Sequence, residues 1–142
     1  MATLPWTVAA DARPAAEVVY MASRLELTSA RHIPGFFRAA FRIRRQVLRS
    51  PGAIGVSLIA ESLHKTFWTL SAWTDDTALN TFVRTEPHRV VMGRYHDRLT
   101  SPQFIRWNAD GASLPAARSN AKERWTEGKS RLAAAQHGGS TH

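Results

Sequence analysis

One stretch, Thr66–Leu99, constrains the fold most, because it reads as a strand that runs directly into an interrupted helix. Residues 67–73 (FWTLSAW) are mostly aromatic or small and lack helical spacing, which predicts a strand. Thr74-Asp75-Asp76 then provides a capping hydroxyl and two acids for the first turn of a helix. Pro87 breaks this helix, and a second helical run begins at His88. We expect the chemistry of the protein at this break.

The elements expected around this stretch alternate as strand, helix, strand, strand, helix, strand. Two such split units predict an α+β fold, a ferredoxin-like βαββαβ sandwich with an antiparallel four-stranded sheet and both helices on one face. The expected strands span 17–27, 53–63, 67–73 and 103–109, and the clearest helix spans 33–50. The expected organisation is an extended lead-in (1–14), a ferredoxin-like domain (15–112), an appended C-terminal helix (113–136) and a disordered tail (137–142).

The predicted strands are apolar on both faces, although the predicted helices cover only one face of the sheet. An uncovered apolar sheet face is an association surface. The pattern therefore predicts a homodimer through the sheet.

Length and composition limit the possible partners. A chain of 142 residues predicts one domain, and the absence of Cys excludes disulfides, thiolate metal sites and a cysteine nucleophile. No leader segment and no run long enough to span a bilayer is present, so we expect a cytoplasmic protein with no membrane span. The net charge of +8 suggests an anionic partner, but the Arg residues are spread along the chain, which is typical of a solvated surface. We expect no specific nucleic-acid partner.

His88 is the candidate catalytic residue. It follows Pro87 at a first helical turn, where the helix dipole lowers the imidazole pKa and favours the neutral form. A neutral imidazole can act as a base, a haem ligand or a hydrogen-bond donor; the alternative is a histidine that only caps the helix. His88 and His96 are eight residues apart, which does not match the spacing of a metal pair, so no metal site is expected.

The strand before the break offers a wall for a pocket. Thr69 and Ser71 share a strand face with Trp73, which places hydroxyls beside an aromatic ring. A mostly apolar pocket with a few polar points is typical of sites for flat organic ligands. The alternative is that these aromatic residues belong to the core.

The string FWTLSAWTDDTALNTFVRTEPHRVVM resembles the strand-to-helix segment of the dimeric α/β-barrel families. These include the antibiotic biosynthesis monooxygenases, and a carotenoid monooxygenase group is similar. The resemblance lies in Trp73, in Asp75-Asp76, in Leu79 with Phe82, and in Glu86-Pro87-His88. It implies a pocket for polycyclic or haem-like molecules between sheet and helices, and oxidation that in many members uses neither flavin nor metal. Haem-degrading relatives carry a Trp and an axial His where this chain has Phe82 and Met92.

Three hypotheses follow. The first is a monooxygenase-like enzyme that oxidises an aromatic or polyene small molecule without a cofactor, with His88 handling a proton. The second is a haem-binding protein with His88 as the axial ligand, and the third is a non-catalytic ligand-binding domain. The residues expected to line the substrate pocket are Phe37, Phe41, Trp73, Phe82 and Met92.

Overall fold

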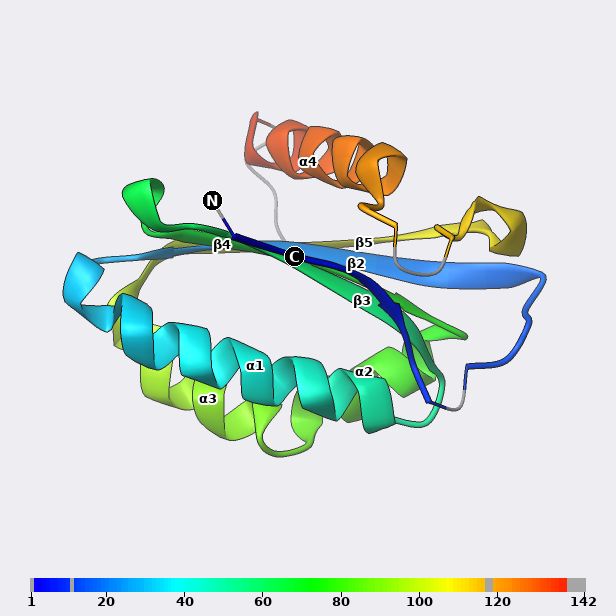
Figure 1. Cartoon of the computed structure of the whole chain (residues 1–142), viewed down its shortest axis with the longest axis horizontal. Helices are drawn as coiled ribbons and strands as arrows, with labels where there is room; N and C mark the ends of the chain where they lie inside the picture. The colour runs from blue at the N-terminus through cyan, green and yellow to red at the C-terminus, as the bar shows by residue number, and fades with distance from the viewer. Residues whose placement is uncertain (1, 11, 117–118, 138–142) are drawn as a thin grey trace.

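The computed structural model describes residues 2–10, 12–116 and 119–137, arranged as three layers (Figure 1). A five-stranded antiparallel sheet forms the middle layer; α1, α2 and α3 lie on one face and α4 on the other. The elements are β1 (Ala2–Val8), β2 (Glu17–Leu27), α1 (Ile33–Arg49), β3 (Ala53–Glu61), β4 (Thr66–Trp73), α2 (Asp76–Arg84), α3 (His88–Tyr95), β5 (Leu99–Asp110) and α4 (Lys122–His137).

The sheet confirms the predicted fold class. Its strand order is β1-β3-β4-β2-β5, and all neighbours are antiparallel. The strands β2 to β5, with α1 and the α2–α3 pair between them, form the ferredoxin-like βαββαβ unit. The central strand β2 pairs on both sides, so that Ala22 lies opposite Leu70 of β4 and Ile105 of β5.

The lead-in contains a fifth strand, which the sequence analysis missed. β1 pairs with the outer edge of β3, and Trp6 is only 1% exposed. The indole of Trp6 lies against Gly55 of β3, where a Cβ atom would collide with the ring. A glycine within a strand can mark such a close approach. Gly55 therefore makes the space that lets β1 dock.

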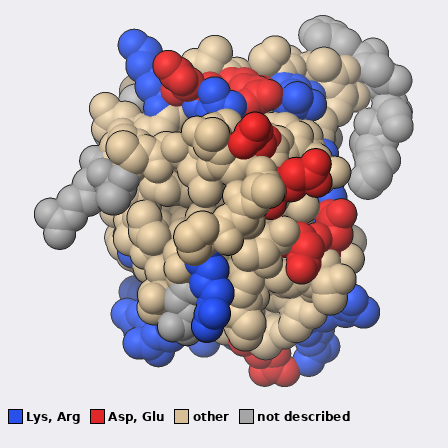
Figure 2. All heavy atoms as spheres, turned by 90° about the vertical axis from the view of Figure 1, so that its right-hand side faces the viewer, with Lys and Arg blue, Asp and Glu red and all other residues tan. Residues whose placement is uncertain are grey.

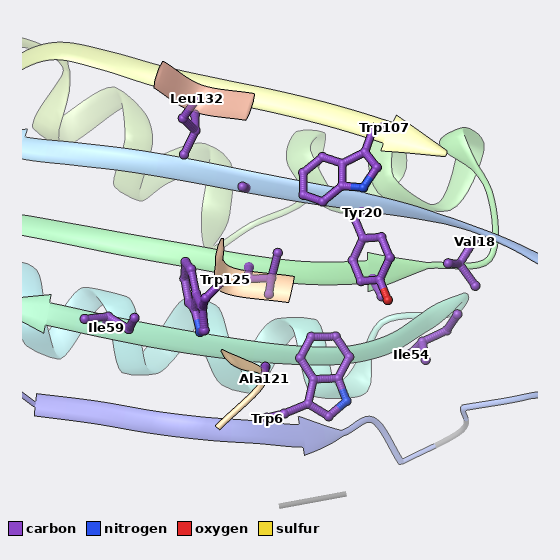
Figure 3. Close-up of a cluster of buried hydrophobic side chains, with 12 residues drawn as sticks. Trp6, Val18, Tyr20, Ile54, Ile59, Trp107, Ala121, Trp125 and Leu132 are labelled. Atoms are coloured by element: carbon purple, nitrogen blue, oxygen red, sulfur yellow. The ribbon is translucent and has the colours of Figure 1, made fainter. Parts of the chain in front are cut away.

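The face opposite α1–α3 is covered, so the reason for expecting a homodimer is wrong. Trp125 and Leu132 of α4 pack on this face, and a Cβ atom placed on Gly128 would be in ordinary contact with Ala22 and Trp107. Trp125 also donates its indole N–H to Ser57 Oγ at 3.1 Å. Figure 3 shows this cluster, in which Trp6, Tyr20, Trp107 and Trp125 gather around the strands. The appended helix provides the cover that a second copy was expected to provide.

The chain reaches α4 along the side of β1, where the backbone N–H of Trp6 donates to the carbonyl of Ser119 at 2.8 Å. The helix begins at Lys122, later than the expected start at residue 113, and ends at His137. The other residues of the expected tail, 138–142, lie outside the described residues. Within the described ranges, no helix has the length and apolar character needed to cross a membrane.

Candidate functional site

The break between α2 and α3 places His88 under the sheet. Asp75 caps α2 by accepting the N–H of Ala78 at 2.8 Å, and the helix ends at Arg84. Pro87 precedes the first residue of α3, which is His88, as the sequence predicted. His88 is the first residue of α3 and its side chain is buried, only 8% exposed.

The imidazole of His88 is held by one hydrogen bond. Its Nδ1 lies 3.1 Å from the carbonyl oxygen of Val83, and the ring packs on Phe82 with centroids 4.8 Å apart. Burial lowers the pKa of His88, and the Val83 carbonyl offsets part of this shift. A neutral ring that donates from Nδ1 keeps a lone pair on Nε2. The sequence predicted the direction of the shift but assigned it to the helix dipole, whereas its main cause is burial.

Gln46 of α1 holds the segment between α2 and α3 through side-chain hydrogen bonds to its backbone. This residue was not predicted from the sequence. Its Oε1 accepts the backbone N–H of His88 at 2.8 Å. Its Nε2 donates to the carbonyls of Phe82 and Thr85 at 3.3 and 3.2 Å. One side chain thus satisfies backbone groups at the end of α2 and the start of α3, which positions His88.

His88 lines a small cavity between the sheet and helices α1–α3. The cavity has a volume of about 60 Å³ and is mostly apolar. Its polar groups besides His88 are Arg44 and three hydroxyls of the central strands, those of Ser23, Thr69 and Ser71. The Ser23 and Thr69 hydroxyls bond each other across β2 and β4, and Ser71 Oγ accepts the indole N–H of Trp73 at 2.9 Å. The cavity therefore combines a neutral base, a cation and weakly polar walls.

The structure brings some of the expected pocket residues together and separates others. Phe82 and Met92 line the cavity with His88, whereas Phe37, Phe41 and Trp73 do not. Phe41 is 42% exposed and stacks on Phe37 with centroids 5.2 Å apart, so it lies outside this cavity, contrary to the expectation. Trp73 is fully buried and packs behind Phe82 at 5.0 Å.

The cavity size decides which ligands fit. Pockets for cofactors and drug-sized ligands usually measure ~300–1,000 Å³. A haem therefore does not fit this cavity of about 60 Å³, although His88 could offer Nε2 to a metal. No cluster of three potential metal ligands occurs in the part of the chain that the structure describes. Met92 and Phe104 also line the cavity, and Phe104 is 40% exposed.

A second hollow lies on the surface between α1 and α2. It is about 760 Å³ in volume, and the exposed side chains of Arg42, Arg45 and Arg49 follow one wall. Figure 2 shows Lys and Arg side chains at several separate places, with acidic side chains between them. The charge on the face drawn in Figure 2 is therefore interspersed, as expected for a solvated surface.

Comparison with known proteins places the fold. No protein-family model matches the sequence, and no curated protein matches it either. Solved structures do match. SnoaB from Streptomyces nogalater, a cofactor-independent oxygenase solved as a mutant form, has a TM-score of 0.51 and 18% identity over 67% of this chain and 94% of that chain.

Two other matches have the same fold at similar distance. An antibiotic biosynthesis monooxygenase has a TM-score of 0.58 and 12% identity, over 68% of this chain and 99% of that chain. A conserved protein from Methanosarcina mazei Go1 has a TM-score of 0.58 and 12% identity, over 65% and 92%. At such identities the likeness establishes the fold alone. The chain has the ferredoxin-like α+β fold found in antibiotic biosynthesis monooxygenase domains.

Proposed function

We propose that the protein is a monooxygenase-like enzyme that oxidises an aromatic or polyene small molecule without flavin or metal. The observation that carries the proposal is the state of His88: buried, neutral, tethered through Nδ1 to Val83, and lining the cavity. A base held in one orientation in a water-poor site is suited to general acid–base catalysis. The fold adds support, since SnoaB, which shares it, is a cofactor-independent oxygenase.

The substrate must itself supply the electrons if no cofactor takes part. For a naphthol, one molecule and one dioxygen give one naphthoquinone and one water. Nε2 of His88 takes the hydroxyl proton, and the electron-rich ring forms a C–O bond with dioxygen. The oxygenated ring carbon then loses its C–H proton as the O–O bond breaks, which leaves one oxygen as the new carbonyl. The other oxygen leaves as water, with that proton and the proton that His88 returns. The substrate loses four electrons, which dioxygen accepts, so the step needs no outside reductant.

The hydroxyl groups in the cavity are compatible with His88 acting as the base. Ser23 and Thr69 already bond each other, so they offer weak secondary contacts rather than competing bases. The burial of His88 and the apolar lining of the cavity limit the contact of a reactive intermediate with water. Met92 and Phe104 line the cavity and Phe104 is 40% exposed, so these are the side chains expected to move when a ring enters.

The test is oxygen uptake by the purified protein with a panel of hydroxynaphthalenes. We expect enzyme-dependent uptake with at least one compound, and with ¹⁸O₂ one labelled atom in the quinone and one in water. Label from water in the quinone, or no uptake above the uncatalysed rate with any compound, would contradict the proposal.

A non-catalytic ligand-binding domain is the second candidate, because the same mostly apolar cavity could hold a ligand without any proton transfer by His88. A binding domain would take up hydroxynaphthalenes without consuming oxygen. Saturable binding measured by isothermal titration calorimetry, together with the absence of oxygen uptake, identifies this alternative.

A further inference from the structure

Arg44 is the charged residue of the cavity, and its position is unusual. It lies on α1 among core-facing positions, four residues after Ala40 and three before Val47, which both line the cavity. Its guanidinium group reaches the edge of the sheet, where an Nη atom donates to Thr7 Oγ1 of β1 at 2.8 Å. Arg44 thus spans from the buried cavity to a surface hollow that Val8 and Phe41 line.

The Nε–H group of Arg44 lacks a partner. The Nε atom is buried from solvent and has no acceptor among the described residues. No carboxylate within those same ranges forms an ion pair with Arg44, and no acidic residue lines the cavity. Buried donors in folded proteins nearly always have an acceptor, and an unpaired one is costly. The arrangement is accounted for if a bound molecule supplies the acceptor.

Other arginines near the sheet have partners inside the protein. Arg24 pairs with Glu26 at 3.4 Å, and Arg106 pairs with Asp76 at 3.1 Å. Arg44 differs because it lines an apolar cavity with its Nε–H buried and without an acceptor among the described residues, while one Nη atom is tethered to Thr7. A fixed guanidinium in a site of low polarity is the group that proteins use to bind a carboxylate.

We propose that the cavity binds an aromatic carboxylic acid whose carboxylate accepts the Nε–H of Arg44. This inference rests on the proposed function in one respect: it names the substrate class of the same cavity, an acid-bearing hydroxyaromatic compound. The cavity of about 60 Å³ suits the acid end of such a molecule, and the ring extends toward Met92 and Phe104. His88 then contacts the hydroxyl group of the ligand, and Arg44 binds its carboxylate.

The test compares benzoate with benzamide, which has nearly the same shape without the charge. Benzoate is the smallest aromatic carboxylate, so its entry requires the least movement. For the wild-type protein we expect benzoate to bind about 10-fold or more tightly than benzamide, the range of a charge-assisted hydrogen bond. Arg44→Met should remove this preference, measured by NMR chemical-shift titration.

Two control variants separate the inference from trivial effects. Arg38→Met removes the same charge from an exposed position of the same helix and should keep the preference for benzoate. Thr7→Val removes the tether on β1 but leaves the guanidinium, so it should weaken the preference for benzoate without removing it. Loss of the preference in Arg38→Met would show a bulk charge effect and overturn the proposal, as would its retention in Arg44→Met.

A measurement on the wild-type protein covers the case in which Arg44→Met does not fold. The ¹⁵N–¹H resonance of Arg44 Nε should shift on addition of benzoate and stay in place with benzamide. Equal shifts, or no binding of benzoate, would contradict the inference. Failure of this inference can be told apart from failure of the proposed function. Selective binding of benzoate without oxygen uptake would support the carboxylate site and contradict the enzymatic function. Oxygen uptake that does not depend on a carboxyl group in the substrate would support the enzymatic function and contradict the carboxylate site.

Discussion

The indole N–H of Trp125 on α4 donates to Ser57 Oγ on β3, and that hydroxyl donates in turn to the carbonyl of Leu4 on β1. This short chain of hydrogen bonds joins the C-terminal helix, the sheet and the N-terminal strand. It lies in the cluster where Trp6 and Trp107 are also buried. The two ends of the chain are therefore fixed to the ferredoxin-like unit through one buried site.

Replacing Trp125 tests this connection. Trp125→Ala removes a side chain that is 6% exposed and should lower the free energy of unfolding by ~3–5 kcal/mol. Trp125→Phe keeps much of the packing and loses the hydrogen bond, so it should cost less. Urea denaturation followed by circular dichroism measures both. A loss below about 1 kcal/mol in the alanine variant would show that α4 adds little to stability.

Removal of α4 tests the role of the covered face. Truncation after Leu114 exposes Leu70, Trp107 and their neighbours, an apolar surface that a soluble protein tends to bury by association. We expect the truncated protein to dimerise or form larger species at micromolar concentration, and the full chain to stay monomeric, by sedimentation velocity. The homodimer expected from the sequence needs this face. A full chain that dimerises through it would contradict the account of α4.

Two glycines predict opposite responses to alanine. Gly55→Ala places a methyl group against the buried indole of Trp6, and such overpacking usually costs ~1–3 kcal/mol. Gly93→Ala, in α3, meets nothing within 4 Å and should stabilise the helix by ~0.5–1 kcal/mol. Thermal unfolding of both variants provides the comparison. Equal effects would show that β1 does not depend on the space at Gly55.

The pH dependence of stability reports the burial of His88. Its pKa is lowered from 6.5 in the folded state, so the unfolded chain takes up the proton first as the pH falls. The stabilising contribution is complete above about pH 6.5 and is lost as the pH falls from there toward the lower pKa of the folded state. The free energy of unfolding should therefore fall more steeply between pH 7 and pH 5 in the wild type than in His88→Gln. Parallel curves would place His88 in water.

Much of the fold was predictable because the spacing of apolar residues indicates strands and helices, and proline marks where a helix ends. The strand at Glu17–Leu27 has the expected bounds, and the helix break at Pro87 is where the sequence placed it. β1 was not recognised, because its seven residues include Pro5 and it is an edge strand that depends on Gly55 far along the chain. The packing of α4 on the sheet was also missed, since spacing predicts a helix but not which face of a sheet it covers.

The site was only partly predictable. His88, Phe82 and Met92 lie together because they share one local segment around the break. Phe41 was misplaced because the buried side of α1 follows Phe36, Ala39 and Val47, and Phe41 lies outside that phase. The same helical spacing could have identified Arg44, because it places Arg44 on the buried side of α1 and the exposed arginines on the other side.

The measurement that tests the central claim most directly is the oxygen-uptake rate of His88→Gln. With a hydroxynaphthalene that the wild-type protein oxidises, such as 1-hydroxy-2-naphthoate, we expect the rate to fall by ~10²–10⁴-fold, typical of a lost acid–base group. The circular dichroism spectrum and the unfolding transition at pH 8 should stay close to those of the wild type, because glutamine can still donate to the Val83 carbonyl. A variant that folds and keeps the wild-type rate would show that His88 does not handle the proton.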